Sequence, residues 1–260
     1  MKKLISCIAV SMLLLAVVVP VVAHAQENEG WKFSAGTMLW LAGLNMESTV
    51  NSTTVKGDQT FTDLLGKLEG SLCAEVSARK DKLSFQVDTV NFYLKEDFPV
   101  STGGDREVKT SMNWLQGLVG YRVLEIPVGE ESKLSFEPTA GYRYYWNRLV
   151  INDVNGDEEA DKNPHWGDVV VGGRVIYDLN PKFSFLVSGT YGGFDWGDSS
   201  KYSWSGAGAV DWHFSKSKTL RVGYMAVSFK KEKDIGGALI DRASIKETLS
   251  GPVISLIWKF

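Results

Sequence analysis

Cysteine and histidine are scarce in this chain. Its 260 residues include two cysteines, Cys7 and Cys73, and three histidines, His24, His165 and His213. Cys7 lies in an N-terminal segment that we expect to be removed, which leaves Cys73 alone and excludes a disulfide framework. The histidines lie on different segments without the spacing of a metal-binding motif. We therefore expect no metal site and no cofactor.

A long uninterrupted apolar segment is also missing after residue 25. A membrane-spanning helix needs about 20 consecutive apolar residues, and no later stretch of the sequence approaches that length. The formal net charge is −3, and charges of both signs are spread along the chain. Because no basic stripe is present, we expect no nucleic acid among the partners.

The first 25 residues have the features of a secretory signal peptide. Lys2 and Lys3 form a basic start, an apolar stretch follows, and Ala23-His24-Ala25 matches the small-x-small pattern of a cleavage site. We expect residues 1–25 to be a cleaved signal peptide and residues 26–260 to form one mature domain.

What the mature chain has in abundance is alternation of apolar and polar residues. The sequence contains 9 Trp, 9 Tyr, 12 Phe and 26 Gly. A period of two places successive side chains on opposite faces of a β-strand. Strands are therefore predicted near 31–43, 71–79, 82–93, 107–124, 133–147, 166–179, from 182 onward, 202–214, 218–231 and 251–260.

The predicted connections alternate in length. Tight joints lie at 80–81, 180–181 and 215–217, and a somewhat longer one lies at 126–129. Longer polar loops lie between them at 43–68, 96–106, 153–165, 194–200 and 232–244. Short turns at one end and long loops at the other are typical of outer-membrane barrels. The sequence thus predicts an all-β fold, an antiparallel transmembrane β-barrel of about 10 strands (roughly 8–12), with both termini in the periplasm.

The loop 43–68 carries two further expectations. Val50–Lys56 can form a short extra strand pair. The segment 61–68 has the pattern of a short amphipathic helix, positioned to fold into the barrel mouth.

A soluble β-sandwich or a lipocalin-like periplasmic barrel also alternates, but with its apolar face inward. Aromatic residues near the predicted strand ends, such as Trp31, Tyr144 and Trp212, favour the membrane barrel because they match interfacial girdles. Charges of both signs on the opposite strand faces favour it as well. The final strand, residues 251–260, also favours the membrane barrel.

The final strand resembles the assembly signal of Gram-negative outer-membrane barrels, in which a terminal aromatic residue follows alternating apolar positions. The matching residues are Ile254, Leu256, Trp258 and Phe260. The segments "WKFSAGTMLWLAGLNM" and "WGDVVVGGRVIYDLNPKFSFLVSGTYGGF" look like those of small, poorly characterised Gram-negative outer-membrane β-barrel proteins.

The resemblance covers nearly the whole mature chain. It implies a location in the cell outer membrane, contact with outer-membrane lipid and lipopolysaccharide, and recognition by the barrel-assembly machinery. It carries no established activity, because a fold does not define a function. We expect the protein to be a monomer.

The inward faces of the predicted strands carry nearly balanced charges. A narrow barrel is filled by its own side chains, and a buried charge without a partner is costly. We therefore expect a charge network that plugs the lumen, and a structural or adhesive role through the extracellular loops. A narrow channel or a porin-like transporter of small solutes is the alternative. The candidate residues are Lys32, Glu75, Asp88, Arg122, Glu137, Arg143, Asp168, Arg174, Asp211, Arg221 and Glu247, with Arg79 and Lys259 on the same faces.

A lipid-modifying enzyme is a third, less favoured alternative. His213-Phe214-Ser215 has the H-x-S spacing found in an outer-membrane lipid A deacylase. This motif adjoins the tight turn at Lys216, on the predicted periplasmic side, away from the leaflet that holds lipid A. We therefore expect no catalytic residues. The acidic segment 153–161 lacks the last glutamate and the helix of an EF-hand, so we expect a solvated loop there.

Overall fold

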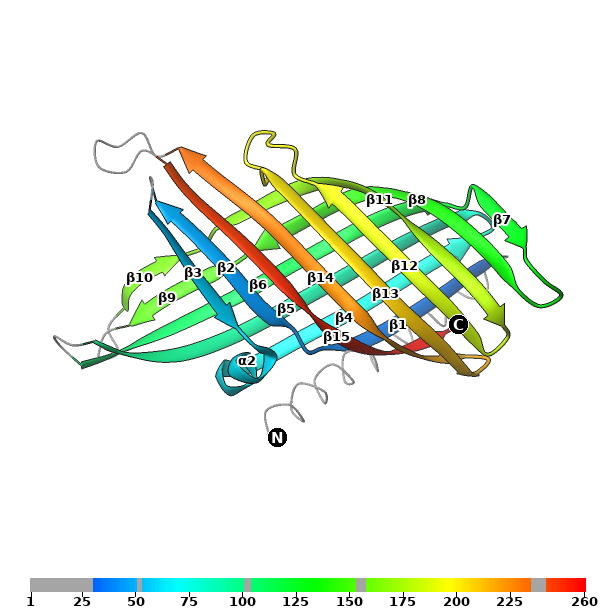
Figure 1. Ribbon diagram of the computed structural model, residues 1–260, viewed down its shortest axis with the longest axis horizontal. Coiled ribbons are helices and arrows are strands. Elements are labelled where there is room, and N and C mark those ends of the chain that lie inside the picture. Colours follow the sequence, from blue (N-terminus) through cyan, green and yellow to red (C-terminus); the bar gives the residue numbers. More distant parts are fainter. Residues whose placement is uncertain (1–29, 51–52, 101–103, 153–157, 235–241) are drawn as a thin grey trace.

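The computed structural model describes residues 30–50, 53–100, 104–152, 158–234 and 242–260. The expected signal peptide and the first part of the acidic segment, residues 153–157, lie outside these ranges. Within the described ranges the chain forms one short helix, α2 (Phe61–Lys67), and fifteen strands (Figure 1). The strands are β1 (Trp31–Trp40), β2 (Gly43–Val50), β3 (Thr53–Gln59), β4 (Leu68–Lys80), β5 (Leu83–Val100), β6 (Gly104–Tyr121), β7 (Leu124–Pro127), β8 (Lys133–Trp146), β9 (Arg148–Asn152), β10 (Glu158–Lys162), β11 (His165–Asn180), β12 (Phe183–Gly192), β13 (Tyr202–Ser215), β14 (Lys218–Asp234) and β15 (Arg242–Lys259).

Ten of the described strands close into a ring. Their order around the wall is β1, β4, β5, β6, β8, β11, β12, β13, β14 and β15, and β15 pairs with β1 again. The pairings around this ring are all antiparallel. The antiparallel barrel of about ten strands is thereby confirmed.

The two ends of the barrel differ, and we call them the turn end and the hairpin end. At the turn end, Phe33 and Phe260 exchange two backbone hydrogen bonds, with N···O distances of 2.9 and 3.3 Å. The tight joints lie there too, and Asp81 adopts a positive φ of 52° in the turn between β4 and β5. This conformation is uncommon outside glycine, but aspartate and asparagine tolerate it better than most residues.

At the hairpin end, strands continue where the sequence predicts loops. β5 and β6 are each 18 residues long and pair as far as Val100 and Gly104. β14 and β15 pair as far as Asp234 and Arg242. The loop prediction at 96–106 is therefore wrong over most of its length. The prediction at 232–244 is wrong at 232–234 and 242–244, and its remaining residues lie outside the described ranges. A transmembrane strand needs only about 9–11 residues, so these hairpins extend beyond a bilayer.

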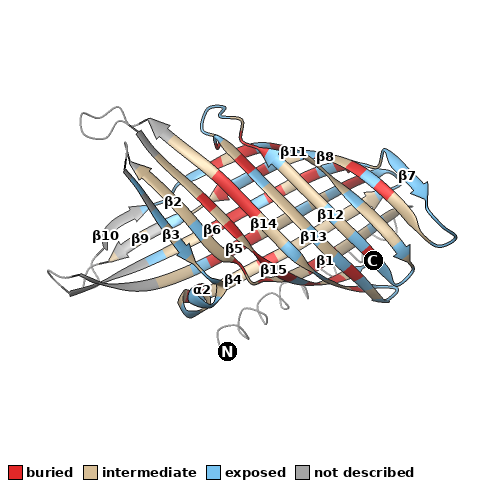
Figure 2. Cartoon of the chain, viewed as in Figure 1, coloured by how far each residue is buried: buried red, intermediate tan, exposed pale blue. Residues whose placement is uncertain are grey.

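The outward face of the wall is apolar. Buried and exposed positions alternate along its strands (Figure 2), and the exposed positions hold large hydrophobic side chains such as Val187, which is 61% exposed, and Tyr224, which is 53% exposed. A continuous apolar surface of this kind is rare on a soluble monomer. The alternation thus has its apolar side outward, as a membrane barrel requires and a sandwich does not. No helix in the described part of the chain is long and apolar enough to cross a membrane.

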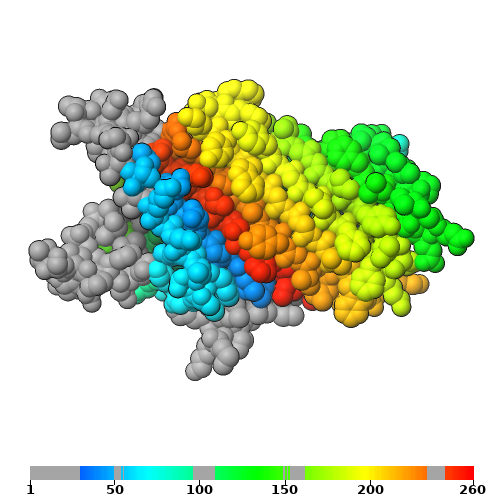
Figure 3. All heavy atoms as spheres, in the orientation of Figure 1, coloured from blue at the N-terminus to red at the C-terminus, as the bar shows by residue number. Residues whose placement is uncertain are grey.

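The segment between β1 and β4 leaves the ring. β2 pairs with β15 and then with β3, so the expected extra strand pair is present and longer than Val50–Lys56. α2 is capped by Thr60, which exchanges hydrogen bonds with Asp63. This confirms the short helix, but its position differs from the expected one. Figure 3 shows β3 and α2 (light blue to cyan) on the outer surface rather than inside the mouth, and β2 lies between β3 and β15 (red).

Candidate functional site

The lumen contains two layers of side chains, one above the other along the barrel axis. The layer nearer the turn end holds ionic and amide groups, and we call it the ion layer. The layer nearer the hairpin end holds aromatic and aliphatic groups, and we call it the apolar layer. The ion layer comprises Glu75, Arg79, Gln86, Asp88, Gln116, Glu137, Arg143, Arg174, Asp211 and Arg221.

Glu137 on β8 is the centre of one half of the ion layer. Its side chain is 1% exposed and forms ion pairs with Arg79 on β4 (Nη2–Oε2, 2.7 Å) and Arg174 on β11 (Nη2–Oε1, 2.9 Å). The Ser84 hydroxyl also donates to Oε1, at 2.5 Å. Two guanidinium groups and a hydroxyl thus compensate one buried carboxylate, which is the condition for a stable buried charge.

Arg221 on β14 is the centre of the other half. It binds Asp211 through two parallel hydrogen bonds of 2.7 and 2.9 Å, and its Nη1 atom lies 3.3 Å from Glu75 Oε2. The paired geometry with Asp211 is the strong, directional form of an arginine–carboxylate contact. Neighbouring Asp88 accepts hydrogen bonds from Gln86 (2.8 Å). Gln86 accepts one from Arg174 (2.6 Å), which connects the two halves.

Arg143 lies on β8 at the boundary between the layers and is 1% exposed. It donates to Gln116 Oε1, to the hydroxyls of Thr190 and Ser205 at 2.8 and 3.0 Å, and to the Tyr145 hydroxyl at 3.3 Å. Its hydrogen-bond partners are therefore neutral acceptors on β6, β8, β12 and β13. The guanidinium connects opposite parts of the wall across the lumen.

The remaining predicted charges lie apart from this network. Asp168 is buried, and its Oδ1 atom accepts a hydrogen bond from the Ser200 backbone N–H at 2.7 Å. Glu247 is buried on β15, and its Oε2 atom has no hydrogen-bond partner among the described residues. At the turn end, Lys32 is exposed and Arg122 pairs with Glu125.

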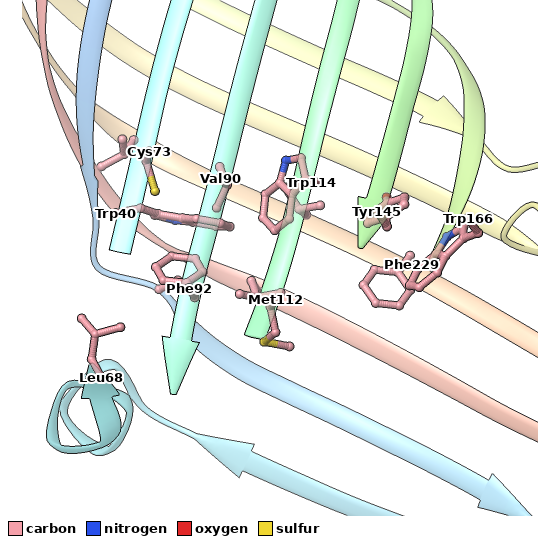
Figure 4. Packing of buried hydrophobic residues seen from close by; sticks show 14 residues of the cluster. Trp40, Leu68, Cys73, Val90, Phe92, Met112, Trp114, Tyr145, Trp166 and Phe229 are labelled. Carbon is pink, nitrogen blue, oxygen red and sulfur yellow. The ribbon is translucent and has the colours of Figure 1, made fainter. Parts of the chain in front are cut away.

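The apolar layer is made of two aromatic groups (Figure 4). Trp40 lies 5.9 Å from Trp114 and 5.8 Å from Phe92, measured between ring centroids. Across the lumen, Tyr145 stacks on Trp166 at 4.7 Å, and Phe229 lies 5.2 Å from both. Val90, Met112, Val227 and Leu249 fill the space around them. This layer closes the lumen toward the hairpin end.

These inward aromatic residues were missed by the sequence analysis, which placed aromatic side chains on the lipid face. A signal for them exists in the strand period. Tyr145 shares the parity of Arg143 and Glu137, and Trp166 shares the parity of Asp168. A large apolar residue in register with charged residues indicates a lumen-facing layer.

A cavity of about 270 Å³, which we call the polar cavity, lies beside the ion layer and reaches the apolar layer. Charged residues such as Glu75, Asp88 and Arg221 line it together with apolar ones such as Trp114 and Val227. Since one water occupies about 30 Å³ in the liquid, the cavity has room for several water molecules or one small polar solute. The apolar layer separates it from the hairpin end.

His213 does not form a catalytic arrangement with Ser215. Its Nε2 atom lies 3.1 Å from the Ser184 hydroxyl, and its Nδ1 atom lies 2.8 Å from the Thr219 hydroxyl and 3.2 Å from Lys259 Nζ. The described residues contain no cluster of three or more His, Cys, Asp or Glu side chains able to hold a metal ion.

A closed ten-stranded antiparallel barrel with an apolar outer face and ionic side chains in its filled interior defines an outer-membrane β-barrel protein. The expected location in the cell outer membrane agrees with this class. The sequence itself matches no protein-family model and no curated protein.

One solved structure supports this class of fold. The outer membrane protease OmpT from Escherichia coli has a TM-score of 0.53 at 10% identity, over 88% of this chain and 97% of that chain. Neisserial surface protein A is less similar, with a TM-score of 0.36 at 12% identity over 89% of this chain and 100% of that chain. The Ail protein of Yersinia pestis has a TM-score of 0.33 at 8% identity, over 90% and 100%.

Proposed function

We propose that this protein is a closed, non-conducting barrel that holds long hairpins at the cell surface and has a structural or adhesive role. The observation that carries the proposal is that the ion layer and the apolar layer follow one another along the lumen. An ion must pass both the ion pairs of Glu137 and Arg221 and the aromatic contacts of Trp40 and Tyr145. Small barrels are generally filled in this way.

The hairpin end supplies the surface for contact with other molecules. Four described hairpins lie there: β2–β3, β5–β6, β9–β10 and β14–β15. Their strands are held together by paired backbones and, within β2–β3, by the ion pair Lys56–Glu47 (2.9 Å). The ion pair Lys201–Glu232 (2.7 Å) ties β14 to the connection before β13. A rigid ribbon loses less entropy on binding than a flexible loop, which favours recognition.

Three further parts of the proposal concern partners and chemistry. We propose that lipopolysaccharide surrounds the wall, and that the barrel-assembly machinery recognises Ile254, Leu256, Trp258 and Phe260. We also propose that the protein has no catalytic activity, because the hydrogen-bond partners of His213 are Ser184, Thr219 and Lys259 rather than a carboxylate.

Planar-bilayer recording tests the closed lumen. We expect the purified protein to insert without steady conductance steps. A Trp114→Ala, Trp166→Ala double variant should conduct little as well, because the ion layer still blocks the path. Large, stable, ion-selective steps from the unaltered protein would overturn the proposal. They would favour the narrow-channel alternative, which the polar cavity of about 270 Å³ supports.

A further inference from the structure

The barrel wall is broken between β1 and β4. Their ladder ends at the pair Thr37 and Ala74, although β1 continues to Trp40 and β4 begins at Leu68. Above Thr37, β1 and then β2 continue along β15. β2 pairs on its other side with β3 instead of β4. Within the described ladders, neither the last residues of β1 nor the first residues of β4 have a partner across this gap.

An apolar cavity of about 220 Å³ occupies the break. Its lining comes from both faces of the wall. Met38, Trp40 and Phe92 belong to the apolar layer in the lumen or pack against it. Leu39 and Ile254 alternate with inward-facing neighbours and point to the lipid side, where Ile254 is 41% exposed. The cavity therefore connects the outer surface of the barrel with its interior.

α2 covers this cavity from the outside. Phe61, Leu64 and Leu65 of the helix line it, and Leu64 is buried. Leu68, directly after the helix, lies beside α2 and belongs to the same buried cluster (Figure 4). The helix thus places its apolar face over part of the break. Outward-facing side chains of β14 and β15, such as Leu220, Ile254 and Leu256, line the cavity beside it.

The chemistry of the lining excludes a polar ligand group. No charged residue is among the described residues that line the cavity. Its two hydroxyl side chains are engaged, since Thr37 donates to the Cys73 carbonyl at 3.4 Å and Ser71 contacts the Cys73 sulfur at 3.7 Å. The polar cavity beside the ion layer differs in this respect, because charged residues such as Asp88 and Arg221 are among its lining.

We propose that this cavity binds one acyl chain of a membrane lipid, which enters sideways from the bilayer through the break between β1 and β4, along the outward-facing side chains of β15 beside α2. The outward-facing lining makes the cavity continuous with the lipid-facing wall, so the neighbouring hydrocarbon is a lipid chain. An engineered apolar cavity of about 150 Å³ holds a benzene molecule, so this larger one accommodates part of a chain. The head group stays outside, near the hairpin end.

The driving force is packing rather than withdrawal of the chain from water. A lipid chain is already in hydrocarbon, so it gains no hydrophobic energy by moving into the cavity. An empty cavity, however, leaves its lining without contact partners on one side. The ion layer closes the lumen below, so the chain is held there and does not pass through the barrel.

Photocrosslinking in vesicles tests the site. The protein is reconstituted in phosphatidylcholine that carries a diazirine at the end of one acyl chain, irradiated, digested and sequenced by mass spectrometry. We expect adducts on the inward residues Met38, Phe92 and Met112, in addition to adducts on lipid-facing Val187 and Val222. Labelling confined to the lipid-facing residues would overturn the proposal.

Two variants of the same kind sharpen the test. Ser71→Trp fills the cavity and should remove the adducts on Phe92 and Met112. Val187→Trp, on the outer face of β12 and 61% exposed, should leave them in place. Heat-modifiable migration on a gel establishes that each variant is folded. If Ser71→Trp fails to fold, Leu65→Trp on α2 takes its place. Inward adducts that persist at full yield in a folded, filled variant would contradict the assignment.

Discussion

The carboxylate of Glu137 illustrates how single charged residues act in this barrel. It is almost fully enclosed and paired with Arg79 and Arg174, whereas Glu125 at the turn end pairs with Arg122 while its side chain stays 42% exposed. Both are glutamate–arginine pairs. They differ in solvation, and solvation decides what the loss of the carboxylate charge costs.

Glu137→Gln should therefore destabilise the barrel far more than Glu125→Gln. Removing one partner of a buried ion pair costs about 3–5 kcal/mol, and an exposed pair contributes less than about 1 kcal/mol. Urea unfolding in detergent micelles, followed by tryptophan fluorescence, measures both variants against the unaltered protein. Equal effects of the two substitutions would show that the ion layer is not a buried network.

Glu232 makes the stability of the hairpin end depend on pH. It lies on β14 beyond the apolar outer band, and hydrogen bonds from Lys201 and Lys230, both at 2.7 Å, lower its pKa from 4.5 to about 2. A lowered pKa means that the folded state favours the ionised form. The contribution is complete above pH 4.5 and is lost as the pH falls through about 2.

Amide exchange at the ends of β13 and β14 should consequently accelerate when the pH is lowered from 4.5 to 2, after correction for the intrinsic exchange rate. In E232Q the corrected rates should not change over this range. An unaltered protein that behaves like E232Q would contradict the assignment of Glu232.

The sequence predicts which face of a strand a lumen residue occupies, but not which residues it contacts. The period of two places Glu75, Glu137 and Arg221 on the face of their strands that is opposite to the apolar side chains. It does not predict their positions along the barrel axis or their neighbours across the lumen, because these depend on the register of strands far apart in the chain. Arg143 shows the difference, since its partners are Gln116, Thr190, Ser205 and Tyr145 rather than a carboxylate.

At the scale of elements, the strands inside the membrane were predictable and the hairpins beyond it were not. In the membrane, one face of each strand meets lipid and the other meets the lumen, which imposes alternation. A two-stranded ribbon in water has two solvated faces, so segments such as 96–100 and 230–234 are strands without an apolar period. In these segments the periodicity of apolar residues therefore cannot distinguish a loop from a two-stranded ribbon.

The helix over the wall break depends on its capping residue. The Thr60 N–H donates to Asp63 Oδ2 at 2.9 Å, and the Asp63 N–H donates to Thr60 Oγ1 at 3.4 Å. Thr60→Ala removes the side-chain cap and should cost α2 about 1 kcal/mol, or roughly five-fold in the local opening equilibrium. Amide exchange of residues 61–67 measures this.

The matched control is Thr54→Ala on β3. Thr54 hydrogen-bonds Thr49 across the hairpin at 2.8 Å and has no part in the cap. Exchange in α2 should be unchanged in this variant. If both variants accelerate α2 equally, the helix is held by the β2–β3 hairpin rather than by its own cap.

At the scale of the whole molecule, the barrel is closed along its axis and open at its side. The ion layer and the apolar layer block the axial path, while the cavity in the break between β1 and β4, partly covered by α2, reaches from the lipid-facing side of the wall to the apolar layer. The hairpin end and the outer wall of the barrel therefore offer chemically different binding surfaces. Polar partners meet the hairpins, and hydrocarbon meets the wall.

The orientation of the barrel in the membrane follows from the same asymmetry and can be measured with single cysteines. Cys73 is 1% exposed, so it should not react in the folded protein. Asp198→Cys places a thiol in the exposed connection between β12 and β13 at the hairpin end, and Lys216→Cys places one in the exposed turn between β13 and β14. A membrane-impermeant maleimide added to intact cells should label only the first variant, and the second should react after the outer membrane is permeabilised. The reverse pattern would mean that the hairpins face the periplasm, and a surface role for them would then be impossible.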